Sequence, residues 1–188
     1  MSSKPLGFVS KKYESGRSGP GTISSGRGDP GGKSYGSFQL ASKTGTLQRY
    51  IASSKYKSVL GAHPVGSLAF DQAWKKLALE QPENFESDQH DFIVRTHYVP
   101  VRLHGNLLNI PSTLAINEAL YSISVQHGGA KRIINAAHIK PTDSEREIIM
   151  KLYTSRRNYV KRYVPKSLHN SLLNRYKNEE RDVLALLG

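Results

Sequence analysis

The sequence has no cysteine and holds only one tryptophan and two methionines in 188 residues. Without cysteine there are no disulfides, no cysteine-ligated zinc, no iron–sulfur cluster and no thiol nucleophile. Long apolar runs are missing too, since no stretch approaches the roughly 20 residues that cross a bilayer. The first ten residues lack the apolar core of a signal peptide. We therefore expect neither a signal peptide nor a transmembrane segment.

Acidic residues are scarce. There are 15 Asp and Glu against 27 Lys and Arg, which gives a formal net charge of +12. A surface with this excess attracts polyanions in general, and nucleic acid, anionic cell-wall polymer and lipopolysaccharide all qualify. The charge alone therefore leaves the class of partner open.

The glycines are concentrated near the N-terminus, and most of the 16 lie between Gly7 and Gly45. A Gly- and Ser-rich stretch can be a disordered linker. Residues 15–45 also carry the aromatic side chains of Tyr35 and Phe38, so we expect an ordered loop that forms part of a functional site. Beyond this loop the sequence reads as helical.

Apolar residues recur at helical spacing from Thr46 onward. Pro82 predicts a helix start, residues 111–113 open another helix, and Thr142 with Glu145 fits a capping box. Two short helices are expected over residues 166–177 and 179–187. The best strand signal is residues 99–103, which Pro100 weakens. The sequence predicts one mostly α domain over residues 1–188, with at most a small β element and basic C-terminal helices over 143–188.

Two carboxylates near the loop are candidates for catalysis. Glu14 is the only Glu in the first 79 residues. If it is buried beside a cleft, desolvation raises its pKa and it can act as a general acid; a plain surface role is the alternative. Asp29 stands in Gly-Asp-Pro-Gly, a strong turn signal, and is either a turn residue or a second catalytic carboxylate.

Short motifs in this region resemble the lysozyme-like superfamily, most of all the goose-type lysozyme and lytic transglycosylase branch. They are Tyr13-Glu-Ser15, Ser34-Tyr-Gly-Ser-Phe-Gln39 and Thr44-Gly-Thr46. The resemblance implies an α+β helical bundle around a sugar cleft, with Glu14 as the general acid. The residues it places on the cleft wall are Tyr35, Gly36, Phe38 and Gln39.

Later segments are similar to cell-wall-lytic proteins of phages and bacteria, among them Ser124-Val-Gln-His-Gly-Gly129. This second resemblance puts Gln126 and His127 in the cleft. Capping or a satisfied place in the core is the alternative for both.

Together the resemblances imply a peptidoglycan-degrading glycosidase that cleaves the β-1,4 bond after N-acetylmuramic acid. It would need no cofactor, and its product, hydrolysed or anhydro, stays open. We expect a monomeric phage endolysin that is released from the host cytoplasm and acts in the periplasm or cell wall. Its partners would be peptidoglycan and, through the basic C-terminal helices, the anionic wall or outer-membrane surface. A bacterial effector exported by a dedicated machine is also compatible.

The sequence also offers signals for two other classes of function. His90, His97 and His127 suggest a metal site, but seven residues on a helix separate the first two by about 10 Å, so no metal is expected. Nine Lys and Arg between Lys151 and Arg181, with tyrosines among them, suit a nucleic-acid-binding protein without enzymatic activity. A solvated helical face explains the same run.

Overall fold

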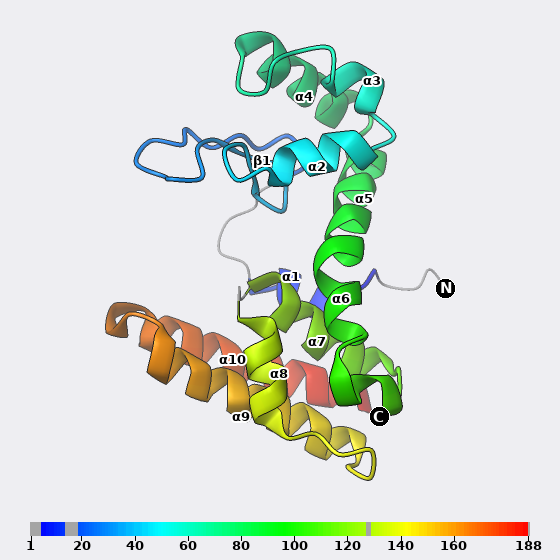
Figure 1. Ribbon diagram of the computed structural model, residues 1–188, viewed down its shortest axis with the longest axis vertical. Coiled ribbons are helices and arrows are strands. Elements are labelled where there is room, and N and C mark those ends of the chain that lie inside the picture. Colours follow the sequence, from blue (N-terminus) through cyan, green and yellow to red (C-terminus); the bar gives the residue numbers. More distant parts are fainter. Residues whose placement is uncertain (1–4, 14–18, 127–128, 188) are drawn as a thin grey trace. The chain divides into compact units, whose positions relative to one another are not determined.

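The computed structural model describes residues 5–13, 19–126 and 129–187 (Figure 1). The chain divides into two compact units, Gly16–Arg95 and Met1–Ser15 together with Thr96–Gly188. We call the first the hairpin unit and the second the helical unit, and describe each by itself. None of the helices in the described ranges is both long enough and apolar enough to span a membrane.

The hairpin unit is built from one short β-hairpin followed by four helices. Strands β1 (Ser34–Tyr35) and β2 (Leu40–Ala41) pair antiparallel, with Tyr35 opposite Leu40. The helices are α2 (Thr46–Ser53), α3 (Lys57–Leu60), α4 (Leu68–Glu80) and α5 (Pro82–Ile93). The start of α5 at Pro82 is the one predicted, because proline suits the first turn of a helix.

An aromatic cluster fills the core of this unit. Trp74 on α4 has no exposed surface, and its ring lies 4.8 Å from that of Phe85 and 5.3 Å from that of Tyr35, centroid to centroid. The indole N–H donates to the carbonyl of Pro20 at 2.8 Å. This hydrogen bond anchors the segment before the hairpin to α4.

The helical unit packs its helices around α7. Its elements are α1 (Phe8–Lys11), α6 (Val99–Arg102), η2 (Gly105–Asn109), α7 (Leu114–Gln126), α8 (Ala130–Ala137), α9 (Glu145–Tyr163), η3 (Lys166–Leu168), α10 (His169–Leu184) and η4 (Ala185–Leu187). The π-helix η1 (Val94–Tyr98) contains the boundary between the units. Helix α7 is buried over most of its length, and Figure 1 shows α9 and α10 lying side by side.

A buried carboxylate ties the N-terminal segment to α7. Glu118 is 1% exposed, and its two oxygens accept the backbone N–H groups of Gly7 at 2.6 Å and Val9 at 2.9 Å. Burial raises the pKa of Glu118, although these backbone hydrogen bonds act in the opposite direction. Residues 7–9 are thereby fixed against the centre of the helical unit.

The predicted class, mostly α with a small β element, is confirmed, but several boundaries differ. Residues 99–102 form helix α6 instead of a strand, with Pro100 in its first turn. The capping box begins at Ser144 and uses Glu147, two residues later than predicted. One helix, α10, replaces the two expected C-terminal helices, and it buries Tyr176 and Val183 on either side of the expected break.

Candidate functional site: the hairpin loop Gly36–Gln39

The loop that joins β1 to β2 begins with a glycine that nothing else can replace. Gly36 has φ +76°, and a Cβ atom there would lie 2.0 Å from Oε1 of Gln89. Its N–H donates to the carbonyl of Thr22 at 2.7 Å. Both the positive φ and the close approach of α5 require a residue without a side chain.

Gln89 on α5 holds the loop in place. It has no exposed surface, and its Oε1 accepts the backbone N–H of Ser37 at 3.1 Å. Its Nε2 donates to the carbonyl of Pro20 at 3.1 Å. One buried amide therefore connects the hairpin loop, helix α5 and the segment that precedes the hairpin, as expected of a buried polar group with satisfied partners.

The outer half of the loop presents an aromatic ring and an amide. Phe38 is half-buried with its ring centroid 5.9 Å from that of His90, and Ser37 Oγ donates to Glu86 at 3.2 Å. Gln39 is exposed at φ +52°, an uncommon conformation for a residue other than glycine. Its side chain accepts from Ser34 Oγ at 2.6 Å, which helps to hold that conformation.

Tyr35 supports the loop from the core. It is fully buried, and its hydroxyl donates to Asp71 Oδ1 at 2.6 Å, while Lys33 Nζ lies 2.6 Å from the other carboxylate oxygen. Burial and the neighbouring carboxylate raise the pKa of Tyr35. The ring has no exposed surface for a ligand, so of the four cleft-wall residues predicted, only Phe38 and Gln39 present side chains at the surface.

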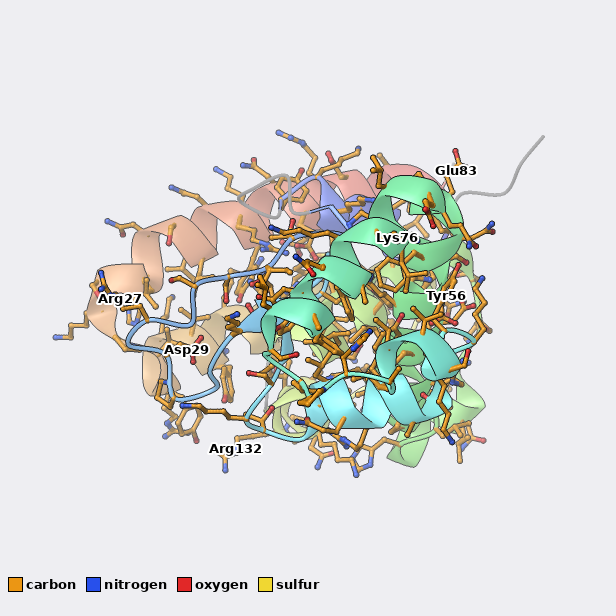
Figure 2. The ribbon with its side chains drawn as sticks, turned by 90° about the horizontal axis from the view of Figure 1, so that it is seen from above. Arg27, Asp29, Tyr56, Lys76, Glu83 and Arg132 are labelled. Carbon is orange, nitrogen blue, oxygen red and sulfur yellow. The ribbon has the colours of Figure 1, made fainter. Side chains whose placement is uncertain are left out.

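The remaining predicted site residues lie elsewhere or outside the described residues. Asp29 is exposed on the loop that extends away from the helices of the hairpin unit (Figure 2), and its Oδ1 accepts the N–H of Gly31 at 2.7 Å. This is the turn geometry weighed above. Gln126, at the end of α7, accepts a hydrogen bond from Arg156. Glu14 and His127 lie outside the described residues.

A second polar cluster, which sequence reasoning missed, is buried in the helical unit. Arg156 and Glu179 have no exposed surface and lie 2.9 Å apart, Nη1 to Oε1. Tyr153 donates to the same oxygen at 2.9 Å, and Arg156 also donates to Ser122 Oγ at 2.9 Å. The guanidinium stacks on the ring of Tyr176, 4.0 Å from its centroid.

The electrostatics of this cluster favour the ionised pair. Burial alone would raise the pKa of Glu179, but the Arg156 charge and the hydrogen bonds to the carboxylate outweigh it and hold that pKa below its usual value. Arg156 follows Leu152 and Tyr153 at helical spacing, on the apolar stripe of α9. That spacing was the signal that this arginine belongs to the interior.

Other members of the basic run also make ion pairs. Lys151 lies 2.6 Å from Asp143, Arg157 pairs with Glu180, and Arg175 lies 3.4 Å from Glu179. The members that stay exposed are Lys161, Arg162, Lys166, Lys177 and Arg181. The run is therefore no continuous cationic face. Across residues 5–13, 19–126 and 129–187, no three His, Cys, Asp or Glu side chains gather as metal ligands would.

These features define a mostly helical protein whose small β-hairpin is held rigidly on a helix. Residues 6–180 match the model of the family described as type VI secretion system spike protein VgrG3-like, C-terminal. The chain belongs to that family. The type VI secretion system spike protein VgrG3 of Vibrio cholerae serotype O1 (strain ATCC 39315 / El Tor Inaba N16961) is 42% identical over 133 residues. The match covers 69% of this chain and 13% of the relative, so the chain spans about an eighth of that protein's length.

The family match overturns the assignment to the lysozyme-like superfamily. The predictions of a muramidase or other glycoside hydrolase, of a phage endolysin and of a peptidoglycan-bound monomer without a protein partner are corrected with it. The nucleic-acid-binding alternative is not supported either. The resemblance rested on short motifs within residues 13–46, whereas the family model extends over residues 6–180, and short Glu-Ser and Gly-x-x-Gln patterns recur by chance.

Proposed function

We propose that this chain is a C-terminal domain of a type VI secretion spike protein and leaves the cell as part of that spike. The match over residues 6–180 carries this proposal, together with the relative named as a type VI secretion system spike protein. The low coverage of that relative supports a division of labour in which the rest of the spike engages the secretion machinery and this domain is carried with it.

Export is tested in a bacterium with an active type VI secretion system. The chain is fused to the C-terminus of a spike protein from which the corresponding domain has been removed. We expect the fusion in the culture supernatant of cells with an intact apparatus and its retention in cells whose apparatus is disabled. A fusion that is retained in both strains, or that appears in both supernatants, would contradict the proposal.

We further propose that the loop Gly36–Gln39 is the surface with which the delivered domain contacts its target. Two features of the loop support this proposal. The buried Gln89 side chain accepts the backbone N–H of Ser37 and fixes the loop, and the side chains of Phe38 and Gln39 reach the surface. A loop held in one conformation loses little entropy on binding. The exposed amide and the aromatic ring supply hydrogen bonding and apolar contact side by side.

The loop is tested with the exported fusion. The measured quantity is the survival of neighbouring recipient cells in co-culture with cells that export the fusion. Phe38→Ser combined with Gln39→Ala should abolish any change in survival that the exported fusion causes, with export unchanged. Leu79→Ser is the matched control, because Leu79 is 83% exposed on α4 of the same unit. If the loop variant and the control affect recipients equally, the loop is not the working surface.

A further inference from the structure

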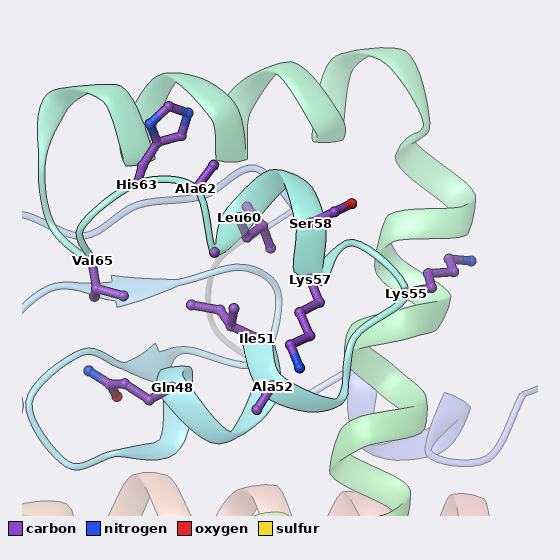
Figure 3. Close-up of a pocket in the computed structure, with 11 residues that line it drawn as sticks. Gln48, Ile51, Ala52, Lys55, Lys57, Ser58, Leu60, Ala62, His63 and Val65 are labelled. Carbon is purple, nitrogen blue, oxygen red and sulfur yellow. The ribbon is translucent and has the colours of Figure 1, made fainter.

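A surface groove of the hairpin unit lies between α2, α3 and the loop that leads to α4. Its volume is about 880 Å³. Figure 3 shows Ile51, Leu60 and Val65 around this space, and Ile51 and Leu60 belong to the core with 9% and 0% exposure. We call it the α2–α3 groove. Its accessible apolar surface comes from Ala52, Ala62 and Val65, and it offers a place for a hydrophobic side chain of a partner.

Two lysines supply the charge on the rim of the α2–α3 groove. Lys55, Lys57 and His63 line it, and Figure 3 shows the Lys57 side chain beside Ile51 and Ala52. The sequence contains no Asp or Glu from Pro30 to Phe70, so no carboxylate of this stretch can neutralise the rim. In the part of the chain that the structure describes, neither lysine makes a salt bridge.

One acidic side chain of the neighbouring helix α5 is already engaged. Asp88 on α5 accepts the Tyr50 hydroxyl at 2.8 Å and the Ser54 hydroxyl at 2.5 Å through Oδ2, and the Lys55 backbone N–H at 3.4 Å through Oδ1. These hydrogen bonds direct its charge to the backbone turn after α2. The Lys55 ammonium lies over the ring of Tyr56, 5.3 Å from its centroid, and the Lys57 ammonium is left for an anionic partner.

Charge and shape together select the occupant. A second copy of this chain would bring another +12 and the same basic rim, which opposes pairing. Phosphate groups of a nucleic acid would form ion pairs with the lysines but would leave the apolar part of the groove uncovered. A peptide with an apolar side chain between carboxylates satisfies both. We propose that the α2–α3 groove binds an acidic segment of a partner protein, its apolar side chain against Ala52, Ala62 and Val65 and a carboxylate at Lys57.

The proposal is independent of export and is tested on the full chain in solution. The probe is a peptide of about 12 residues composed of Leu and Glu, compared with a Leu and Lys peptide of the same length. Binding is measured by calorimetry, and the contact surface by amide chemical-shift changes. We expect binding of the Leu and Glu peptide alone, with shifts confined to residues 48–65 and an affinity that falls as salt rises.

Two groove variants have matched controls on α4 of the same unit. Lys57→Glu reverses a rim charge, and Ala62→Trp fills the groove. Each should lower the affinity for the Leu and Glu peptide by about tenfold or more. The controls, Lys75→Glu and Ala69→Trp, change residues that are also exposed but lie outside the groove. They should lower the affinity for the same peptide by less than about twofold. All four replace exposed residues, and equal thermal midpoints check that they fold.

Three results would overturn the proposal. The first is no binding of the Leu and Glu peptide at about millimolar concentration. The second is binding that groove and control variants weaken alike. The third is shifts at residues 48–65 caused equally by single-stranded DNA or by anionic lipid vesicles, which would assign the groove to a polyanion or a membrane surface.

Discussion

Two glycines with nearly the same backbone conformation have very different surroundings. Gly36 has φ +76° and faces Gln89, while Gly45 has φ +79° with nothing within 4 Å of a Cβ placed there. A side chain at either position meets the backbone strain of a positive φ, which costs roughly 1–2 kcal/mol. Only at Gly36 does it also collide with a buried side chain.

We predict that Gly36→Ala destabilises the protein by about 2–5 kcal/mol, because overpacking against Gln89 adds to the backbone strain. Gly45→Ala, which has the strain without the collision, should cost only about 1–2 kcal/mol. Urea unfolding followed by circular dichroism measures both. Equal losses for the two variants would show that the contact with Gln89 does not constrain the loop.

The buried pair Arg156–Glu179 makes a second prediction at this scale. Arg156→Met leaves the Glu179 carboxylate without its main partner in a site with no exposed surface, and should cost about 3–5 kcal/mol. Adding Glu179→Leu should recover most of that loss, since the uncompensated charge is then gone. The free energies of unfolding in urea measure both.

The neighbouring ion pair is the control. Arg157 pairs with Glu180, and the Arg157 side chain is 28% exposed. Arg157→Met should therefore cost about 1 kcal/mol or less. A double variant of Arg156 and Glu179 as unstable as the single Arg156→Met would mean that the packing of the guanidinium on Tyr176 matters more than the charge pair.

At the scale of elements, one side chain of α7 holds the N-terminal segment. Glu118 accepts the N–H groups of Gly7, which precedes α1, and of Val9, which lies within α1. Because burial raises the pKa of Glu118, the folded state binds its proton more tightly than the unfolded state does. Its contribution to stability is present in full below the usual value of 4.5 and is lost as pH rises through the raised value.

We predict that the stability of the wild type relative to Glu118→Gln decreases as pH rises from about 4 to 7, since the variant lacks this titration. Urea unfolding of the two proteins at a series of pH values measures the difference. Glu179, whose pKa is lowered, contributes stability that is lost as pH falls, but it is common to both proteins and largely cancels. A difference that is constant or grows with pH would be inconsistent with a raised pKa.

Sequence patterns predicted some of these elements correctly and others not. Helical spacing predicted α2, α4 and α7, and proline marked the start of α5. The strand signal at residues 99–103, already weakened by Pro100, belongs to a helix in the structure, because an apolar run of this length is compatible with either element until its neighbours are known. The last long helix, α10, continues through residue 178, where the sequence predicted a break, and it packs against α9.

At the scale of the whole molecule, the net charge of +12 works against compactness. We predict that the thermal midpoint rises by a few degrees between about 10 and 200 mM NaCl, because salt screens the repulsion among the excess cations. Differential scanning calorimetry measures the midpoint.

Replacing the exposed residues Lys75, Lys131 and Lys177 by Gln lowers the net charge and should reduce this salt dependence. If the midpoint instead falls with salt, attraction within ion pairs such as Lys33–Asp71 outweighs the repulsion. The same charge also disfavours self-association, which agrees with an acidic occupant for the α2–α3 groove.

The sequence by itself determined the mostly helical class, the excess of positive charge and the turn at Asp29, because helical spacing, charge and turn residues are local properties. The motifs that suggested a lysozyme-like enzyme were equally local, and a match over nearly the whole chain overturned them. Only the tertiary structure decided that Tyr35 is buried and that Phe38 and Gln39 reach the surface. It also placed Arg156 in the interior, because a buried charge depends on a partner, Glu179, that another helix, α10, supplies.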